Sequence, residues 1–346
     1  MEYPIGIEGD YIETKEESLI FDVKGLLHPK DRKICFLRFY PDPKGDRKRG
    51  NISYKKIYDL NERFEFLRKN HPKYLFFSEK FDMELQGVEL KDIKKIYTPR
   101  EFLSLVRKQE NVSGIKRLSL ELCEIFIKEV GIPESNIGIS GSSMVNLERK
   151  DSDIDLIIYG TNTSLNFQNK LKELFANIPN LRKYNSKELK DHYHSRFGGS
   201  NIEYKAYLFS EKRKLHQGKF KNVDFFLRYI KSPSDWKGKY EDYSFKNLGR
   251  VKLIALIENS KDSIFTPCSY KIKVEQVLKK HIYQKEINLN EINEVNSYRG
   301  RFCEQAVEGE RVVVEGKLER VIFKGSSFYR ILLTDQVNDK MFVLKK

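Results

Sequence analysis

The sequence contains few cysteines, and they lie far apart. Four occur among the 346 residues: Cys35, Cys123, Cys268 and Cys303. This spacing excludes the CxxC pairs of a zinc knuckle, and it excludes the dense disulfide framework of a small secreted domain. We therefore expect reduced thiols in the core of the protein.

Long hydrophobic runs are also lacking. No apolar segment approaches the roughly 18 to 20 residues that span a bilayer. The first six residues include Glu2, where a secretion signal would be basic. We therefore expect a cytoplasmic protein with no membrane partner.

Positive charge is in excess along the whole chain. Lysine and arginine number 64 against 50 acidic residues, a net charge of +14. The surplus is three, five and six over residues 1–110, 111–230 and 231–346. A surplus spread over folded segments favours a polyanionic partner such as nucleic acid or a nucleotide, although heat-adapted proteins are also rich in lysine.

Length and composition predict a folded protein of several domains. Hydrophobic residues make up 39% of the chain, which includes 23 Phe and 19 Tyr. A chain of 346 residues exceeds what one core usually organises. We expect an α+β protein with a β-rich amino-terminal domain of unknown role (1–98), a central domain with a mixed sheet and helices (99–235), and a mostly β carboxy-terminal domain (236–346).

Periodicity and capping residues predict the individual elements. Strands are expected at residues 18–24, 33–40, 52–57, 202–209, 222–230, 250–257, 311–321, 327–333 and 340–344. Helices are expected from Asp59 to His71, from Pro99, and at residues 113–130, 165–176, 186–194 and 274–283. Residues 41–50, rich in proline, glycine and basic side chains, are expected to form an irregular loop.

A pair of aspartates in an apolar strand carries the chemical signal. Asp153 and Asp155 are two residues apart, so on a strand they share one face, while Ile154 and Leu156 face the other way. Two such carboxylates can converge on divalent ions, and paired ions support in-line phosphoryl transfer. Oxygen ligands favour Mg²⁺ or Mn²⁺ over zinc.

A run of small residues precedes this strand. It comprises Ser140, Gly141, Ser142 and Ser143. Small side chains allow backbone N–H groups to approach a phosphate, and a short helix opening over residues 143–148 would add its dipole. The run therefore predicts a nucleotide-binding bend.

Gly141-Ser142, ten intervening residues and Asp153-Ile154-Asp155 resemble the signature of the nucleotidyltransferase superfamily, which includes DNA polymerase beta, poly(A) polymerases, CCA-adding enzymes and predicted archaeal members. The resemblance implies that Gly141 and Ser142 contact the β and γ phosphates of an NTP, and that Asp153 and Asp155 hold the metal ions. The sequence has Asp151 where the family often has glycine.

The family also requires a third carboxylate on a neighbouring strand. Asp224 is our candidate because apolar strand residues enclose it, and Glu203 is the alternative. By this resemblance Asp153, Asp155 and Asp224 form the catalytic and metal-binding set. A salt-bridged structural role for Asp224 is the competing interpretation.

Two basic segments are candidates for nucleic-acid binding. Lys212 and Arg213 lie in a basic connection, and Arg299 and Arg301 alternate with aromatic residues. The second segment and the strands after it are similar to the first strands of an OB-fold, a barrel that stacks bases on aromatic rings. An exposed hairpin and a plain packing domain are the alternatives.

The sequence thus predicts an Mg²⁺- or Mn²⁺-dependent nucleotidyltransferase. It would move a nucleoside monophosphate from an NTP to an acceptor hydroxyl, with RNA favoured as acceptor, and release pyrophosphate. One alternative is a non-catalytic RNA-binding or scaffold protein that retains the fold. Another is an enzyme that modifies a protein or a small molecule.

Overall fold

The strands of the protein form three sheets in the residues that the structure describes. The structure is a computed structural model that describes residues 3–197, 202–283 and 287–344. The sheets have eight, five and six strands within these ranges. By its internal contacts the described chain divides into two compact units: unit 1 (1–77, 84–182 and 216–237) and unit 2 (78–83, 183–215 and 238–346).

The first sheet belongs mainly to unit 1. Its main path runs β4-β5-β3-β2-β1-β8, and β7 pairs with both β3 and β6. The elements are β1 (Tyr11–Thr14), β2 (Ile20–Val23), β3 (Arg32–Pro41), β4 (Arg47–Arg49), β5 (Ile52–Lys56), α1 (Leu60–Asn70), β6 (Leu75–Ser78), β7 (Met83–Glu89) and β8 (Ile93–Tyr97). Asp59 caps α1 as predicted, because its side chain accepts hydrogen bonds from the amides of Asn61 and Glu62.

Both faces of the first sheet are covered. On one face Phe21 and Leu37 pack with Leu67 of α1. On the other face Phe39 and Tyr54 pack with residues that follow the Ser140–Ser143 run, including Met144 and Leu147. This second contact fixes the first sheet against the segment that carries the predicted bend.

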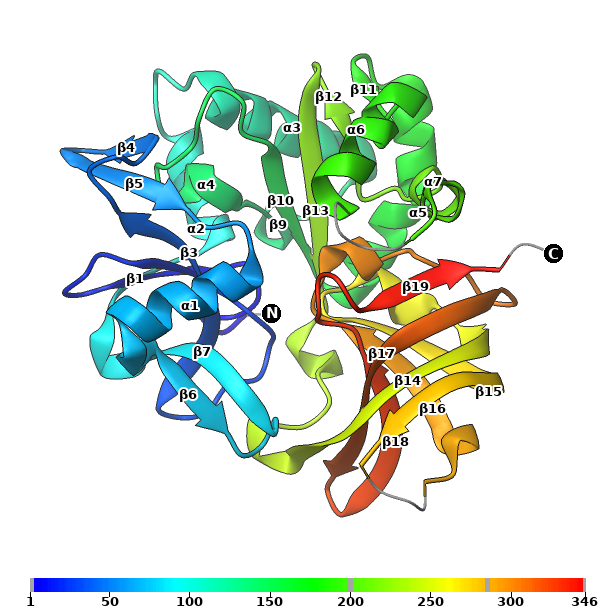
Figure 1. The fold of residues 1–346 in the computed structure, drawn as a ribbon. Helices are drawn as coiled ribbons and strands as arrows, with labels where there is room; N and C mark the ends of the chain where they lie inside the picture. The colour runs from blue at the N-terminus through cyan, green and yellow to red at the C-terminus, as the bar shows by residue number, and fades with distance from the viewer. Residues whose placement is uncertain (1–2, 198–201, 284–286, 345–346) are drawn as a thin grey trace. The chain divides into compact units, whose positions relative to one another are not determined.

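The second sheet carries the predicted aspartates. Its order is β11-β12-β13-β10-β9, with β10 and β13 parallel and the other pairs antiparallel (Figure 1). The strands of this sheet are β9 (Ile137–Ile139), β10 (Ile154–Tyr159), β11 (Leu181–Arg182), β12 (Gln217–Phe220) and β13 (Val223–Ile230). The helices in this part of the chain are α2 (Pro99–Arg107), α3 (Gly114–Val130), α4 (Gly141–Met144) and α5 (Thr161–Asn177). The rings of Phe126 in α3 and Phe167 in α5 meet edge to face with their centroids 4.9 Å apart, and Phe167 also contacts Tyr229 of β13, so these helices cover one face of the sheet.

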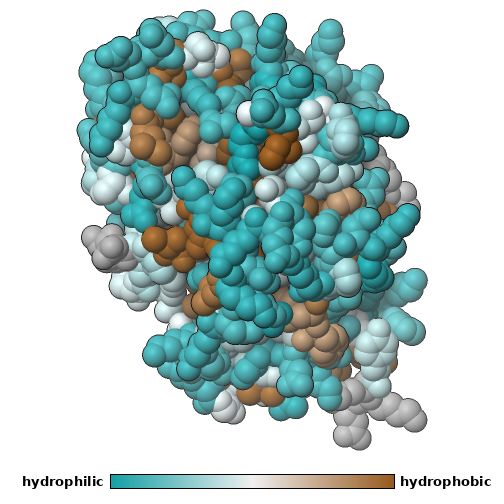
Figure 2. Space-filling model, turned by 90° about the vertical axis from the view of Figure 1, so that its left-hand side faces the viewer, coloured by the Kyte–Doolittle hydropathy of each residue, from teal (hydrophilic) through white to brown (hydrophobic). Residues whose placement is uncertain are grey.

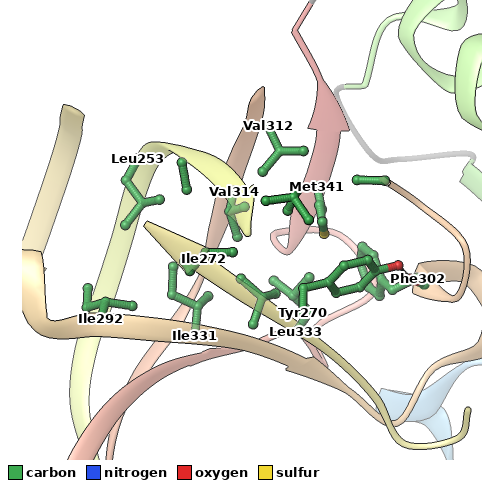
Figure 3. Packing of buried hydrophobic residues seen from close by; sticks show 14 of the residues in the cluster. Leu253, Tyr270, Ile272, Ile292, Phe302, Val312, Val314, Ile331, Leu333 and Met341 are labelled. Atoms are coloured by element: carbon green, nitrogen blue, oxygen red, sulfur yellow. Dashed lines mark hydrogen bonds between the residues drawn. The ribbon is translucent and has the colours of Figure 1, made fainter. Parts of the chain in front are cut away.

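Unit 2 contains a closed ring of strands. The ring is β14-β15-β16-β18-β17 and returns to β14, and β19 extends it from β17. The elements are α6 (Ser186–Phe197), α7 (Tyr204–Glu211), β14 (Tyr243–Asn259), β15 (Cys268–Ile282), β16 (Ile292–Ser297), β17 (Arg311–Phe323), β18 (Ser326–Leu332) and β19 (Lys340–Val343). Figure 3 shows the core inside it, where Leu253, Tyr270 and Val314 are buried together. Cys268 and Cys303 are reduced and buried in the same core, as expected.

Three sequence-based expectations about secondary structure are wrong. Residues 202–209 were expected as a strand but form most of α7, because Tyr204 and Tyr207 lie one helical turn apart and both contact Tyr193 of α6. Residues 274–283 were expected as a helix, but residues 274–282 continue β15 because β14 pairs with this part of the strand. The loop at residues 41–50 contains β4, which pairs with β5.

Two further findings concern the hydrophobic residues of the protein. In the part of the chain that is described, no helix is both long enough and apolar enough to cross a membrane. The face of the molecule that includes the first sheet is mostly hydrophilic, and its hydrophobic residues are divided among separate patches (Figure 2).

Candidate active site

The alternation of β10 presents the two aspartates as predicted. Ile154, Leu156 and Ile158 are buried on the face that the helices cover. Asp153 and Asp155 therefore lie on the opposite face, where Asp153 is exposed and Asp155 is partly buried.

The predicted bend lies directly against this pair. The amide of Ser140 donates to the Asp155 carbonyl at 2.8 Å. Gly141 has a φ of +74°, and a Cβ added there would lie 2.9 Å from the Asp155 carboxyl carbon and closer still to Oδ2. Only glycine fits this position without displacing the carboxylate.

The serine hydroxyls of the bend are engaged within the protein. Ser140 Oγ donates to the Gly9 carbonyl at 2.9 Å, and Ser143 Oγ donates to the Ser140 carbonyl at 3.1 Å. Ser142 Oγ lies 3.4 Å from Ser152 Oγ. A phosphate at this bend would therefore be met by backbone N–H groups. The helix that follows, α4, begins at Gly141, two residues earlier than the sequence predicted.

Asp151 occupies the position where the similar family often has glycine. Arg149 Nε and Nη2 donate to the two Asp151 oxygens at 2.8 and 2.5 Å, and Arg149 Nη1 donates to Asp46 at 2.5 Å. These hydrogen bonds from Arg149 lower the pKa of Asp151. The additional negative charge of Asp151 is therefore paired with Arg149 and stands apart from the Asp153–Asp155 pair.

Asp224 lies near the start of the neighbouring strand, at the level of Asp153. Ile154 of β10 pairs with Phe225 of β13 in parallel register, so the residues just before them, Asp153 and Asp224, lie side by side on the same face. Lys219 of β12 lies directly across from Asp224, and its Nζ is 3.2 Å from Asp224 Oδ1.

The alternative third acid lies elsewhere. Glu203 is the N-cap residue of α7 and does not belong to a strand. Over the described ranges, no cluster of three or more His, Cys, Asp or Glu side chains is arranged to hold a metal ion. The aspartate pair is therefore the acidic centre of the site.

Cations from other elements act electrostatically on the aspartate pair. Burial, and then the charge of Asp153, raise the pKa of Asp155 to about 7. The charges of Arg228, Lys56 and Arg38 oppose this rise. Burial and the charge of Arg38 lower the pKa of Lys56 to about 8, while the two aspartates oppose that shift.

Sequence reasoning missed Arg38 and Lys56, which come from β3 and β5 of the first sheet. Ile20 pairs with Phe39 and Phe21 pairs with Leu37, so Arg38 is the extra residue of a β-bulge. A bulge redirects a side chain out of the regular alternation. No local pattern could have revealed these cations, because their position depends on how the first sheet packs on the second.

The four candidate nucleic-acid-binding residues lie in unit 2. Arg213 pairs with Glu310 at 2.6 Å, and Lys212 is exposed after α7. Arg299 donates to the Thr334 carbonyl, and Arg301 donates to carbonyls of the loop between β18 and β19 at 3.0 to 3.3 Å. Arg213, Arg299 and Arg301 therefore stabilise unit 2 through their guanidinium groups.

Comparisons with known proteins give one relative and no assigned function. No protein-family model matches the chain, and no solved structure matches it. The chain is similar to the uncharacterized protein MJ1086 of Methanocaldococcus jannaschii, with 28% identity over 329 residues that cover 93% of each chain. The similarity therefore extends through both units.

Proposed function

We propose that the protein is a metal-dependent nucleotidyltransferase that moves a nucleoside monophosphate from an NTP to an acceptor hydroxyl. The observation that carries this proposal is the packing of Gly141 against the carboxyl group of Asp155. It brings a bend of small residues, suited to phosphate, against an Asp-x-Asp pair, suited to hard cations. Asp224 at the same level of the next strand supports the assignment.

The acidic residues fit a magnesium or manganese ion in part. Asp153 and Asp155 offer only oxygen ligands on one face of β10, and burial, followed by the charge of Asp153, raises the pKa of Asp155. Asp224 Oδ1 is held by Lys219, so Asp224 would join the ligand set only after that contact opens. When bound, the metal would neutralise charge on the phosphates and activate the acceptor hydroxyl.

The residues of the chain then have separate roles. The backbone at Gly141 and Ser142 positions the triphosphate, and Asp224 orients the acceptor hydroxyl. The acceptor oxygen bonds to the α phosphorus while the bond from that phosphorus to the bridging oxygen breaks. Pyrophosphate leaves, and the hydroxyl proton passes to Asp224 or to water.

The strand ring of unit 2 favours nucleic acid as the acceptor. Numbered along the chain, β14 to β18 pair in the order 1-2-3-5-4-1, with strands three and five parallel. This order is that of an OB-fold, which often binds single-stranded nucleic acid. We therefore propose a protein of three parts: the first sheet, a polymerase-beta-like domain and an OB-like domain. In this proposal the protein is a cytoplasmic enzyme that acts on RNA.

Labelled nucleotides test the transfer directly. The protein is incubated with each α-labelled NTP, Mg²⁺ or Mn²⁺ and total cellular RNA, and the labelled macromolecule is identified. We expect Asp153→Asn to reduce transfer at least about 100-fold. Asp151→Asn is the matched control in the same segment, and it should retain transfer. Equal transfer by wild type and Asp153→Asn would refute the assignment.

A non-catalytic nucleic-acid-binding protein is the second candidate. The Lys219–Asp224 ion pair favours this second candidate, because Lys219 pairs with the carboxylate that we propose as the third acid. Thermal unfolding with and without NTP and Mg²⁺ separates the two. An enzyme should be stabilised by about 2.7 kcal/mol when the ligand is at 100 times its Kd. RNA binding that is indifferent to Mg²⁺, with no stabilisation by NTP, would favour the second candidate.

A further inference from the structure

A basic groove lies beside the candidate active site in unit 1. It has a volume of about 590 Å³ and is lined by residues 45–48, 113–115 and 148–150. These segments are β4 with the turn before it, the start of α3, and the connection between α4 and β10.

The acidic side chains of the groove are already paired. Asp46 contacts Arg149 at 2.5 Å, and Glu148 contacts Lys116 at 2.9 Å. Lys48 and Lys150 are exposed, and no side-chain partner is found for either lysine within the described ranges. The groove therefore presents positive charge that its own acids do not neutralise.

The two walls of the groove are tied together. Arg47 is 5% exposed, and its Nη1 donates to the Leu147 carbonyl at 2.5 Å. The amide of Arg149 donates to Ser152 Oγ at 2.8 Å, and Ser152 contacts Ser142 of the bend. The groove is thus connected to the candidate active site by hydrogen bonds.

An exposed aromatic ring contacts both the groove and a lysine whose charge acts on the aspartates. Tyr58 is 65% exposed, and its hydroxyl lies 3.5 Å from Arg47 Nη2. Lys56 Nζ is 4.8 Å from the centre of the Tyr58 ring. Lys56 in turn interacts electrostatically with Asp153 and Asp155. Contacts therefore run from the groove over Tyr58 to Lys56, and the charge of Lys56 acts on the two aspartates.

We propose that this path binds the single-stranded end of a nucleic acid acceptor, with Lys48 and Lys150 on its phosphates and Tyr58 stacked on a base near the reacting hydroxyl. The inference rests on the proposed function for the identity of the reaction. Basic side chains that follow a backbone, with an aromatic ring for an unpaired base, are the usual features of single-strand binding. A base within a duplex has no open face for Tyr58.

The test measures binding without catalysis. Fluorescence anisotropy of a labelled single-stranded RNA is recorded in EDTA, without NTP, over a range of salt concentrations. Lys48→Gln combined with Lys150→Gln should reduce the slope of log K against log salt by about 1.4, since each phosphate contact on a single strand contributes about 0.7. Tyr58→Ala should weaken binding roughly tenfold or more, and Tyr58→Trp should restore it.

The chain offers matched controls. Lys128 is exposed at the far end of α3 from the groove, and Phe77 is 64% exposed on β6, so Lys128→Gln and Phe77→Ala should bind as wild type does. Circular dichroism and thermal unfolding confirm that each variant is folded.

Three results would overturn the groove assignment. The first is that the groove variants bind single-stranded RNA as tightly as the control variants do. The second is that they lose as much affinity for a duplex of the same sequence as for the single strand. The third is that they lose as much affinity for polyglutamate. Because binding in EDTA does not depend on transfer, such a result leaves the nucleotidyltransferase proposal intact. Conversely, if the Asp153→Asn test refutes the nucleotidyltransferase proposal, the RNA-binding measurements still test the groove.

Discussion

Gly141 lies so close to the carboxyl group of Asp155 that no side chain fits between them. Gly141→Ala would add a Cβ at this contact and also place alanine at a φ of +74°. We expect the free energy of unfolding to fall by about 2 to 4 kcal/mol, from backbone strain and steric displacement together. Chemical denaturation measures this loss.

Gly131 is a matched control for that substitution. It has the same φ of +74°, and no described atom lies within 4 Å of a Cβ added there. Gly131→Ala should therefore cost only about 1 to 2 kcal/mol, the backbone contribution alone. Equal losses at the two positions would show that the contact with Asp155 is unimportant.

Lys219 should restrain Asp224. Lys219→Gln removes the cation 3.2 Å from Asp224 Oδ1, and the Asp224 side chain is 41% exposed. The stability change should be below about 1 kcal/mol because the pair is screened by solvent. Release of a carboxylate oxygen should strengthen Mg²⁺ binding several-fold, as measured by calorimetry.

Lys221→Gln serves as the control for Lys219. Lys221 is the neighbouring exposed lysine and pairs with Glu121 at 2.5 Å, so its removal should leave Mg²⁺ binding unchanged. If both variants bind Mg²⁺ like the wild type, Asp224 does not belong to the ion site.

Asp10 should make stability depend on pH. Burial raises the pKa of Asp10 to about 7, although its Oδ2 accepts hydrogen bonds from the amides of Gly6 and Ile7. Between about pH 4 and 7 the folded protein retains a proton that the unfolded chain has lost, so stability falls as pH rises, by up to about 1.4 kcal/mol per unit. Asp10→Asn should flatten this dependence and be the more stable protein at pH 8.

Thermal unfolding across pH 4 to 8 measures this effect. Asp59→Asn is the control, because asparagine is also a good N-cap for α1 and Asp59 is not a buried acid. An unchanged slope in Asp10→Asn would mean that Asp10 is ionised throughout this range in the folded protein.

Arg228 should be important for stability. Its Nη1 is 2.6 Å from Glu8 Oε1, and the Glu8 side chain is fully buried. Arg228→Met should cost about 3 to 5 kcal/mol, because it removes the closest cation from a buried carboxylate. Adding Glu8→Gln should recover part of the loss. A double variant less stable than Arg228→Met would contradict this explanation.

Local sequence determined the elements that frame the site. Apolar residues at positions 154, 156 and 158 fixed which face of β10 the helices cover, and therefore which face holds Asp153 and Asp155. Asp59 and Gly131 mark the start of α1 and the end of α3 because capping is a property of a few adjacent residues. Alternation failed at α7 and β15, where contacts with α6 and β14 decided the conformation.

Tertiary structure alone decided what surrounds the aspartates. Arg38 and Lys56 act on them electrostatically because the first sheet packs on Met144 and Leu147. Arg149 pairs with Asp151 and also with Asp46 of a distant turn. Periodicity and spacing report which face of an element is apolar, since burial acts residue by residue along the chain. They do not report which charged side chains meet, because electrostatic partners are set by distances between elements that are remote in sequence.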